Sequence, residues 1–313
     1  MTKNIETKAP RNRTIFLTPE DYQHYAILEL LPEGKDVIPV ARASNKIFYA
    51  SCLAGMSRLP KASMDLIFAD PPYYGRDKDF GNGTINLSLD EYVNWSDHWI
   101  SLAAGLLKKT GSMYVCCDWR FSGKIQEILN KYLIIKNRIT WLREKGRGSL
   151  RNWKEDMEDI WFCVASEAYT FNVENVKIRK PIVAPYRYEN KQPKGWIENN
   201  DDRYRYTYPP NIWLDTVVPF WSMYENTPHP TQKPEKLVER IILANSNLGD
   251  LIFDPFMGAG TTAVVAKRLG RNFIGFEVNE DYVRLALKRL DKLTQEQFLS
   301  TSKKDKHRLV MLI

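Results

Sequence analysis

The sequence predicts an α/β protein in which helices cover a parallel sheet. Short apolar runs at 66–69 and 112–117 have the length of buried strands. Between them, residues 89–107 carry apolar side chains at helical spacing. Strands and helices that alternate in this way indicate βαβ units, because parallel strands are joined by covering helices.

The alternation returns near the C-terminus, after a segment of a different kind. Residues 166–228 are rich in proline and tyrosine and show little periodicity, so we expect an inserted, loop-rich recognition segment. After it, helix, strand, helix, strand and helix are predicted over 234–244, 251–253, 261–269, 272–276 and 281–293. The pattern predicts no element for the tail from 294.

Composition points to a partner. The chain has 313 residues, and its 45 Lys and Arg against 38 Asp and Glu give a net charge of +7. This excess favours an anionic partner, with nucleic acid the first candidate, although an ordinary basic surface would also produce it.

Other features predict a cytoplasmic protein without a membrane segment or a structural metal. No run of about 18 apolar residues occurs, and residues 1–13 lack the apolar core of a secretory signal. The four cysteines form no CxxC pair and lie in apolar stretches, so we expect reduced core residues.

A glycine loop at 254–262 follows one predicted strand and opens a helix. Gly258 and Gly260 allow a tight turn and close approach to a ligand, and Glu277 ends the next strand, where ribose hydroxyls are bound in Rossmann-like sites. A nicotinamide oxidoreductase is disfavoured, because Ala263 replaces the third glycine and Asp254 would repel a pyrophosphate. A cationic nucleoside without phosphate, such as S-adenosylmethionine, suits the loop better.

A second turn, Asp70-Pro71-Pro72-Tyr73, directly follows the strand at 66–69. The two prolines fix the backbone and bar a helix from starting there. The turn therefore presents a carboxylate, backbone carbonyls and an aromatic ring where α/β sheets bind their ligands. Such a set suits the exocyclic amino group of a flipped base.

Together with HPTQKP at 229–234, these two motifs resemble those of the beta class of DNA amino-methyltransferases, in the same permuted order. The resemblance covers about residues 46–165 and 229–292. It implies a Rossmann-like, S-adenosylmethionine-dependent methyltransferase fold with circularly permuted motifs and an inserted target-recognition region. The implied reaction is methyl transfer from S-adenosylmethionine to adenine N6 or cytosine N4 of DNA.

The resemblance also implies roles for individual residues. Asp70 and the carbonyl of Pro71 would accept hydrogen bonds from the target amino group, within the catalytic set Asp70, Pro71, Pro72 and Tyr73, and Tyr73 would stack on the base. The implied cofactor-binding residues are Ser51, Cys52, Asp70, Lys233, Asp254, Pro255, Phe256, Gly258, Gly260, Thr261, Thr262 and Glu277. Ser51 departs from the family, which commonly has Asp there, and this puts cofactor affinity in doubt.

DPPY accompanies adenine N6 more often than cytosine N4 in this family, so adenine is the expected target. Cytosine N4 and a catalytically inactive nucleic-acid-binding relative remain alternatives. The implied partners are DNA, a homodimer mate and a separate cognate restriction endonuclease, with no membrane partner.

Basic residues indicate where DNA would be held. Residues 136–154 contain seven basic side chains against one acidic one, and 177–206 contain eight against four with interleaved tyrosines. The predicted DNA-binding residues are Arg143, Lys145, Arg147, Arg151 and Lys154. The loop at 74–88 is predicted to be a lid over the flipped base.

The predicted organisation has four parts. An N-terminal extension (1–45) precedes a catalytic and cofactor-binding α/β domain (46–141 and 229–293). The target-recognition region (142–228) includes part of the core sheet at about 157–165, and a tail (294–313) follows.

Overall fold

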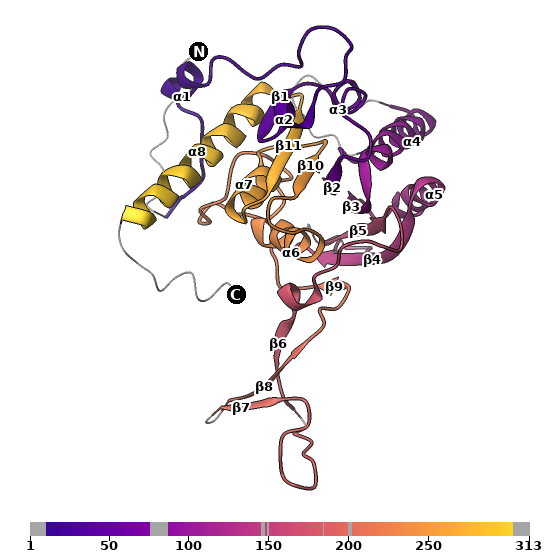
Figure 1. Ribbon diagram of the computed structural model, residues 1–313, viewed down its shortest axis with the longest axis vertical. Helices are drawn as coiled ribbons and strands as arrows, with labels where there is room; N and C mark the ends of the chain where they lie inside the picture. Colours follow the sequence, from indigo (N-terminus) through magenta and orange to yellow (C-terminus); the bar gives the residue numbers. More distant parts are fainter. Residues whose placement is uncertain are drawn as a thin grey trace.

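A computed structural model describes residues 11–75, 87–144, 148, 150–183, 185–199 and 202–302. Its main sheet has eight strands in the order β1-β11-β10-β2-β3-β5-β4-β9 (Figure 1). The strands are β1 (Lys46–Tyr49), β2 (Met64–Ala69), β3 (Leu107–Cys117), β4 (Ile134–Leu142), β5 (Met157–Val164), β9 (Ile212–Trp213), β10 (Leu251–Asp254) and β11 (Asn272–Glu277).

All neighbouring strands of this sheet are parallel except at β5, which is antiparallel to both β3 and β4. The parallel part is the sheet that the βαβ rhythm predicts. The order along it reverses between β10 and β2, which pair directly although they are far apart in the chain. In an open α/β sheet, such a switch point leaves a crevice at the carboxyl ends of the strands, where ligands bind.

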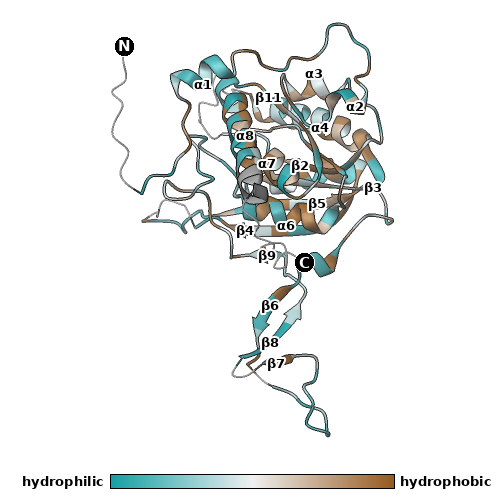
Figure 2. Cartoon of the chain, turned by 60° about the vertical axis from the view of Figure 1, so that its left-hand side comes forward, coloured by the Kyte–Doolittle hydropathy of each residue, from teal (hydrophilic) through white to brown (hydrophobic). Residues whose placement is uncertain are grey.

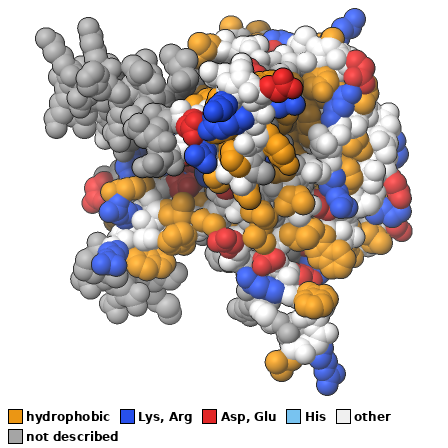
Figure 3. Space-filling model, turned by 90° about the horizontal axis from the view of Figure 1, so that it is seen from below, with side chains coloured by type: hydrophobic (Ala, Val, Ile, Leu, Met, Phe, Trp, Pro, Cys, Tyr) orange, Lys and Arg blue, Asp and Glu red, His pale blue; other side chains and the backbone are white. Residues whose placement is uncertain are grey.

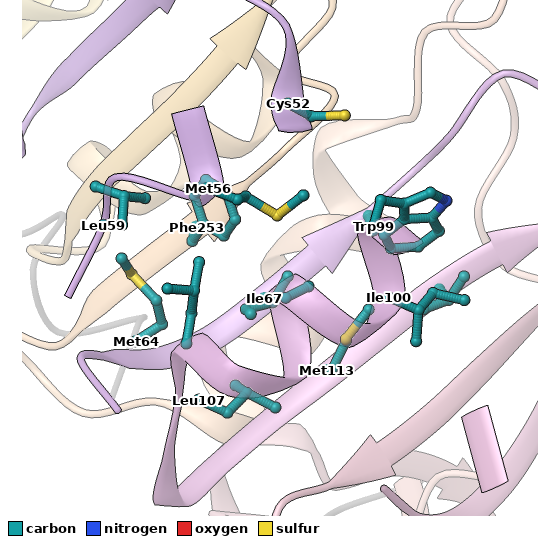
Figure 4. Packing of buried hydrophobic residues seen from close by; sticks show 14 of the residues in the cluster. Cys52, Met56, Leu59, Met64, Ile67, Trp99, Ile100, Leu107, Met113 and Phe253 are labelled. Carbon is teal, nitrogen blue, oxygen red and sulfur yellow. The ribbon is translucent and has the colours of Figure 1, made fainter. Parts of the chain in front are cut away.

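Helices cover both faces of the sheet. One hydrophobic cluster joins α3 (Cys52–Met56), α4 (Leu89–Leu106) and α5 (Ser122–Tyr132) to the sheet through Met56, Trp99 and Ile125. Figure 4 shows Met56 and Trp99 in this cluster. The other joins α6 (Glu235–Asn245), α7 (Thr261–Arg268) and α8 (Glu280–Ser302) through Leu237, Val264 and Val283.

The strands alternate between these two clusters, as the period of two in a β-strand requires. In β2, Ile67 and Ala69 belong to the first cluster, whereas Leu66 and Phe68 belong to the second. Because both faces are buried, the strand reads as a continuous apolar run.

The segment predicted to be loop-rich contains further elements: η1 (Val173–Val176), β6 (Ile178–Pro181), β7 (Ile197–Asn199), β8 (Asp202–Thr207) and the core strand β9. Strands β6, β8 and β7 form a small antiparallel sheet, which we call the arm. The arm projects away from the body of the molecule (Figures 1 and 2), and hydrophilic residues dominate it in Figure 2.

The two ends of the described chain pack against each other. Near the N-terminus, α1 (Pro19–His24) lies beside α8, where Lys288 donates to Asp21 at 2.5 Å and Tyr25 donates to Asp291 at 2.7 Å. A short α2 (Val40–Ala43) precedes β1. Helix α8 extends to Ser302, beyond the predicted end at 293, because 294–302 contains further helix-forming residues.

Candidate functional site

The DPPY turn begins where β2 ends. Its two prolines hold the backbone extended, and the hydroxyl of Tyr92 in α4 donates to the carbonyl of Pro72 at 3.1 Å. The turn is therefore fixed to the helix that covers this end of the sheet. Because β2 and β10 are parallel neighbours, Asp70 and the loop that follows β10 both lie at the carboxyl ends of the strands.

A buried cluster of polar and charged side chains surrounds Asp70. The ammonium nitrogen of Lys233 lies 2.5 Å from Oδ1 of Asp70 and 3.3 Å from Oε2 of Glu158 in β5. The hydroxyl of Tyr73 lies 3.0 Å from Oδ1 of Asp70 and 3.1 Å from Oε2 of Glu158. Arg143, after β4, donates to Oε1 of Glu158 at 3.0 Å. Two carboxylates thus face two cations.

Burial perturbs the protonation of this cluster. It raises the pKa of the Asp70 carboxyl, although the neighbouring Lys233 ammonium opposes the rise. Burial alone would lower the pKa of Lys233, but Asp70 and Glu158 outweigh it and hold the pKa above its ordinary value. Burial and the same carboxylates also raise the pKa of Tyr73. Lys233 is therefore a fixed cation and Tyr73 a neutral phenol.

The glycine loop joins β10 to α7, also at the carboxyl ends of the strands. Gly258 and Gly260 have positive φ angles of 52° and 82°, a region that side chains rarely adopt. The amide of Gly258 donates to Oε2 of Glu277 at 2.7 Å, and the amides of Val278 and Asn279 donate to Oε1. Burial nevertheless raises the pKa of Glu277.

Asp254 lies beneath this loop and holds its shape. Its carboxylate accepts from the amide of Phe256 at 2.9 Å and from the hydroxyl of Thr262 at 2.5 Å. Burial raises the pKa of Asp254 to about 7, although both hydrogen bonds oppose the rise. From α8, the buried Arg289 donates to the carbonyl of Ala259 at 2.7 Å and supports the loop from behind.

Two connected openings adjoin the cluster. A small one of about 30 Å³ lies between the DPPY turn and the glycine loop. A larger cleft of about 1020 Å³ adjoins it, and Lys233 and His229 line both. Glu158, Arg143 and the largely exposed Trp153 also line the larger cleft. Lys233, which contacts Asp70 and lines both openings, thus lies between the cleft and the catalytic turn.

The structure brings most of the predicted cofactor residues together. The small opening is lined by Asp70, Lys233, Asp254, Phe256, Gly258, Thr261 and Thr262. Glu277 adjoins it through Gly258, and Pro255 is buried within the loop. Ser51 instead caps α3 by accepting from the amide of Ala54 at 3.2 Å, and Cys52 is buried in the core. A cofactor contact by these two residues stays a prediction.

The predicted DNA-binding residues are dispersed. The side chain of Arg143 is turned inward to Glu158, and Lys154 pairs with Asp156 at 3.3 Å. Arg151 is exposed. Lys145 and Arg147 lie outside the described residues, as does most of the predicted lid, 76–86. Their contact with DNA stays a prediction.

The sequence motifs did not identify Glu158, Tyr92 or Arg289 as part of the site. The signals for Glu158 were a carboxylate at the start of a buried apolar strand and a weak family similarity over 157–162, neither of which gave it a role. Within the described ranges, no helix is long and apolar enough to cross a membrane, and no three His, Cys, Asp or Glu side chains gather as metal ligands. The described cysteines are all free and buried.

Comparison with known proteins agrees with this geometry. Residues 64–288 match the model of a DNA methylase family. The chain is 35% identical over 253 residues to the DNA adenine methyltransferase YhdJ of Escherichia coli (strain K12), covering 78% of this chain and 82% of that protein. It is 32% identical over 249 residues to the Type II methyltransferase M.HpaI of Haemophilus parainfluenzae, covering 79% and 74%.

Solved structures show the same architecture. The M1.HpyAVI–SAM complex is 29% identical, with a TM-score of 0.51 over 78% of this chain and 98% of that chain. The cytosine-N4-specific PvuII DNA methyltransferase, at 19% identity and a TM-score of 0.59, covers 80% and 90% and shows the fold alone. The chain therefore belongs to the N6/N4 DNA methylase family, whose members transfer methyl groups from S-adenosylmethionine to DNA.

Proposed function

We propose that this methyltransferase modifies the exocyclic N6 of adenine in a base rotated out of DNA. The supporting observation is the position of Asp70. Its Oδ1 is held by Lys233 and Tyr73, and its carboxylate lines the small opening at the switch point of the sheet, beside Lys233, which lines both openings. An acceptor fixed at the end of a cleft suits a base amino group.

The chemistry follows from the weakness of the nucleophile. The lone pair of an aromatic amino group is delocalised into the ring, so the nitrogen attacks poorly. Asp70 and the carbonyl of Pro71 would accept its two hydrogens out of the ring plane and draw the nitrogen towards tetrahedral geometry. S-adenosylmethionine would supply an activated methyl group: as the N–CH3 bond forms, the S–CH3 bond breaks, a neutral thioether leaves, and the amino nitrogen releases one proton. The protein contributes positioning and preorganised acceptors.

The residues at the small opening fit that cofactor. It is a cation with two ribose hydroxyls, and the opening is lined by the carboxylates of Asp70 and Asp254, with Glu277 next to it through its hydrogen bond with Gly258. Glu277 is already oriented by backbone amides, which leaves its carboxylate directed at the loop. Phe256 would cover the adenine ring, and Gly258 and Gly260 would let the backbone approach closely. The Lys233 ammonium is paired with the Asp70 carboxylate, and this pairing offsets its repulsion of the sulfonium.

The larger cleft and the arm would hold DNA. Exposed aromatic side chains, including Trp153 and Trp221, line the cleft and could stack on bases. On the arm, Lys180 lies directly opposite Arg205 across β6 and β8. Like charges opposite each other weaken a sheet, whereas a phosphate between them would offset the repulsion. Figure 3 views the molecule from the arm's end, where Lys and Arg side chains (blue) lie among hydrophobic ones (orange).

The identity of the methylated base tests the proposal. The purified protein would be incubated with unmethylated DNA and S-adenosylmethionine, and the digested nucleosides analysed by mass spectrometry. The proposal expects N6-methyladenine. Detection of N4-methylcytosine would show that the target is cytosine rather than adenine. Absence of any methylated base would contradict the methyltransferase activity.

The proposal extends to the protein's setting. Several similar proteins are named Type II methyltransferases, so a separate restriction endonuclease that cuts the same sequence is a proposed partner. A homodimer and a cytoplasmic location are likewise proposed. Measurement of the molecular mass in solution would test the homodimer. An assay for a nuclease that cuts the same sequence in the source cells would test the restriction endonuclease.

A further inference from the structure

The carboxylate of Asp70 is held asymmetrically. Its Oδ1 contacts both the Lys233 ammonium and the Tyr73 hydroxyl, at 2.5 and 3.0 Å. Among the residues that the structure describes, none hydrogen-bonds to its Oδ2. One oxygen is therefore fixed by the protein, and the other remains for the amino group of a bound base.

Both groups that hold Oδ1 are themselves held by Glu158. Its Oε2 lies 3.3 Å from the Lys233 ammonium and 3.1 Å from the Tyr73 hydroxyl. The single hydrogen of the hydroxyl can serve only one carboxylate at a time, so Asp70 and Glu158 share it. The side chain of Glu158 is 4% exposed, and its position on β5 between β3 and β4 is rigid.

The other oxygen of Glu158 faces outward along the cleft. Oε1 accepts from Arg143, whose other guanidinium nitrogen donates to the carbonyl of Glu155 at 3.4 Å. Arg143 belongs to the basic segment 136–154, which is predicted to contact DNA. A continuous chain of contacts therefore runs from this segment through Arg143 and Glu158 to Lys233, Tyr73 and Asp70.

We propose that Glu158 is a positioning residue for methyl transfer, which holds Lys233 and Tyr73 on Oδ1 of Asp70 so that Oδ2 faces the target amino group. The inference rests on the proposed function of Asp70. It adds a residue that acts through Lys233 and Tyr73 and sets the orientation and the charge of the acceptor.

The charges around Asp70 predict the direction in which its pKa should shift when Glu158 or Arg143 is replaced. The facing groups are Lys233, Tyr73, Glu158, Cys116 on β3 and Asp254 on β10, with Arg143 behind Glu158. Ionised Asp70 is a stronger acceptor than the neutral acid and cannot donate back to the base, so activity should fall as pH drops through its pKa. Glu158 is among the groups that raise this pKa. Removing its charge should lower the pKa, and removing the Arg143 charge should raise it.

The test compares pH–rate profiles of Glu158→Gln and Arg143→Gln with the wild type, under single-turnover conditions with saturating DNA and S-adenosylmethionine. We expect kcat to fall at least tenfold in Glu158→Gln, with an unchanged Kd for S-adenosylmethionine. Its acidic limb should move to lower pH, and that of Arg143→Gln should move to higher pH.

Glu155→Gln is the matched control, because Glu155 is exposed and lines the same cleft. Its acidic limb should not move, since solvent screens an exposed charge. Limbs that stay together in all variants, or that shift in the same direction, would overturn the inference. A wild type that methylates no adenine would instead overturn the proposed function. If one variant does not fold, the direction in which the acidic limb of the other variant moves still tests the inference.

Discussion

The ammonium nitrogen of Lys233 lies 2.5 Å from Oδ1 of Asp70, although Lys233 lies in the last third of the sequence and Asp70 directly follows β2 in the first quarter. The HPTQKP segment therefore serves the catalytic turn directly. Gln232 fixes this segment by accepting from the amide of Thr227 at 3.0 Å and donating to the carbonyl of Glu225 at 2.7 Å.

Replacement of Lys233 by Met should destabilise the fold and abolish methylation. It leaves the carboxylates of Asp70 and Glu158 buried without their shared cation, a loss of about 3–5 kcal/mol in the free energy of unfolding. Denaturant unfolding would measure it. Lys236→Met is the control, because Lys236 is exposed and its ion pair should contribute at most about 1 kcal/mol. Equal losses in the two variants would contradict the account.

Substitution of Gly260 by Ala should destabilise the glycine loop. Its φ of 82° disfavours any side chain, and an added Cβ would lie 2.5 Å from the Cβ of Ala286. We expect a loss of more than about 1–2 kcal/mol in thermal or chemical unfolding, with weaker cofactor binding. By contrast, Gly123→Ala in α5 meets no atom within 4 Å and should gain about 0.5–1 kcal/mol. A neutral Gly260→Ala would show that the loop is not tightly packed.

The unfolding free energy should depend on pH through Asp254. Its pKa is raised from 3.8 to about 7 in the folded protein, so the folded state binds this proton more tightly than the unfolded state. Stability from this group is therefore present at low pH and is lost as pH rises towards 7. Because one pKa unit is about 1.4 kcal/mol, the loss is a few kcal/mol.

Asp254→Asn should lack that loss, so its stability relative to the wild type should increase between about pH 4 and 7. Unfolding in denaturant at several pH values would measure the difference. The exposed Asp36→Asn should follow the wild type throughout. Parallel curves for wild type and Asp254→Asn would contradict an elevated pKa.

Charge reversal on the arm should weaken DNA binding without affecting cofactor binding. We expect Lys180→Glu with Arg205→Glu to raise the Kd for DNA and to reduce the slope of its logarithm against log salt by about 2. Lys61→Glu with Lys109→Glu changes the net charge equally but lies outside the arm, at the amino ends of the central strands β2 and β3. If both pairs weakened binding equally, the arm would not be a specific DNA contact.

Much of this fold could be predicted from the sequence, because its signals are local. The apolar run of β2, the helical spacing of α4 and the glycines of the 254–262 loop each require a particular backbone, and the predicted elements are confirmed. The family, the methyltransferase fold and the cofactor class are confirmed by the comparisons.

Other features depend on contacts between distant residues. Strand β9 has two residues and exists only because it pairs with β4, and the arm strands are polar on exposed surfaces. Glu158 looks like any strand residue until β5 places it beside Lys233 and Tyr73. The motif placed Lys233 among the cofactor-binding residues, which stays a prediction, but it gave no sign that the Lys233 ammonium also contacts Asp70.

The central claim is that Asp70 acts on the target base rather than on the cofactor or the fold. Asp70→Ala tests it most directly, by methyl transfer to DNA and by calorimetric binding of S-adenosylmethionine to the same preparation. The account predicts that methylation is lost by at least a thousandfold (on the order of 4 kcal/mol) while the cofactor still binds. Turnover close to that of the wild type in this variant would contradict it.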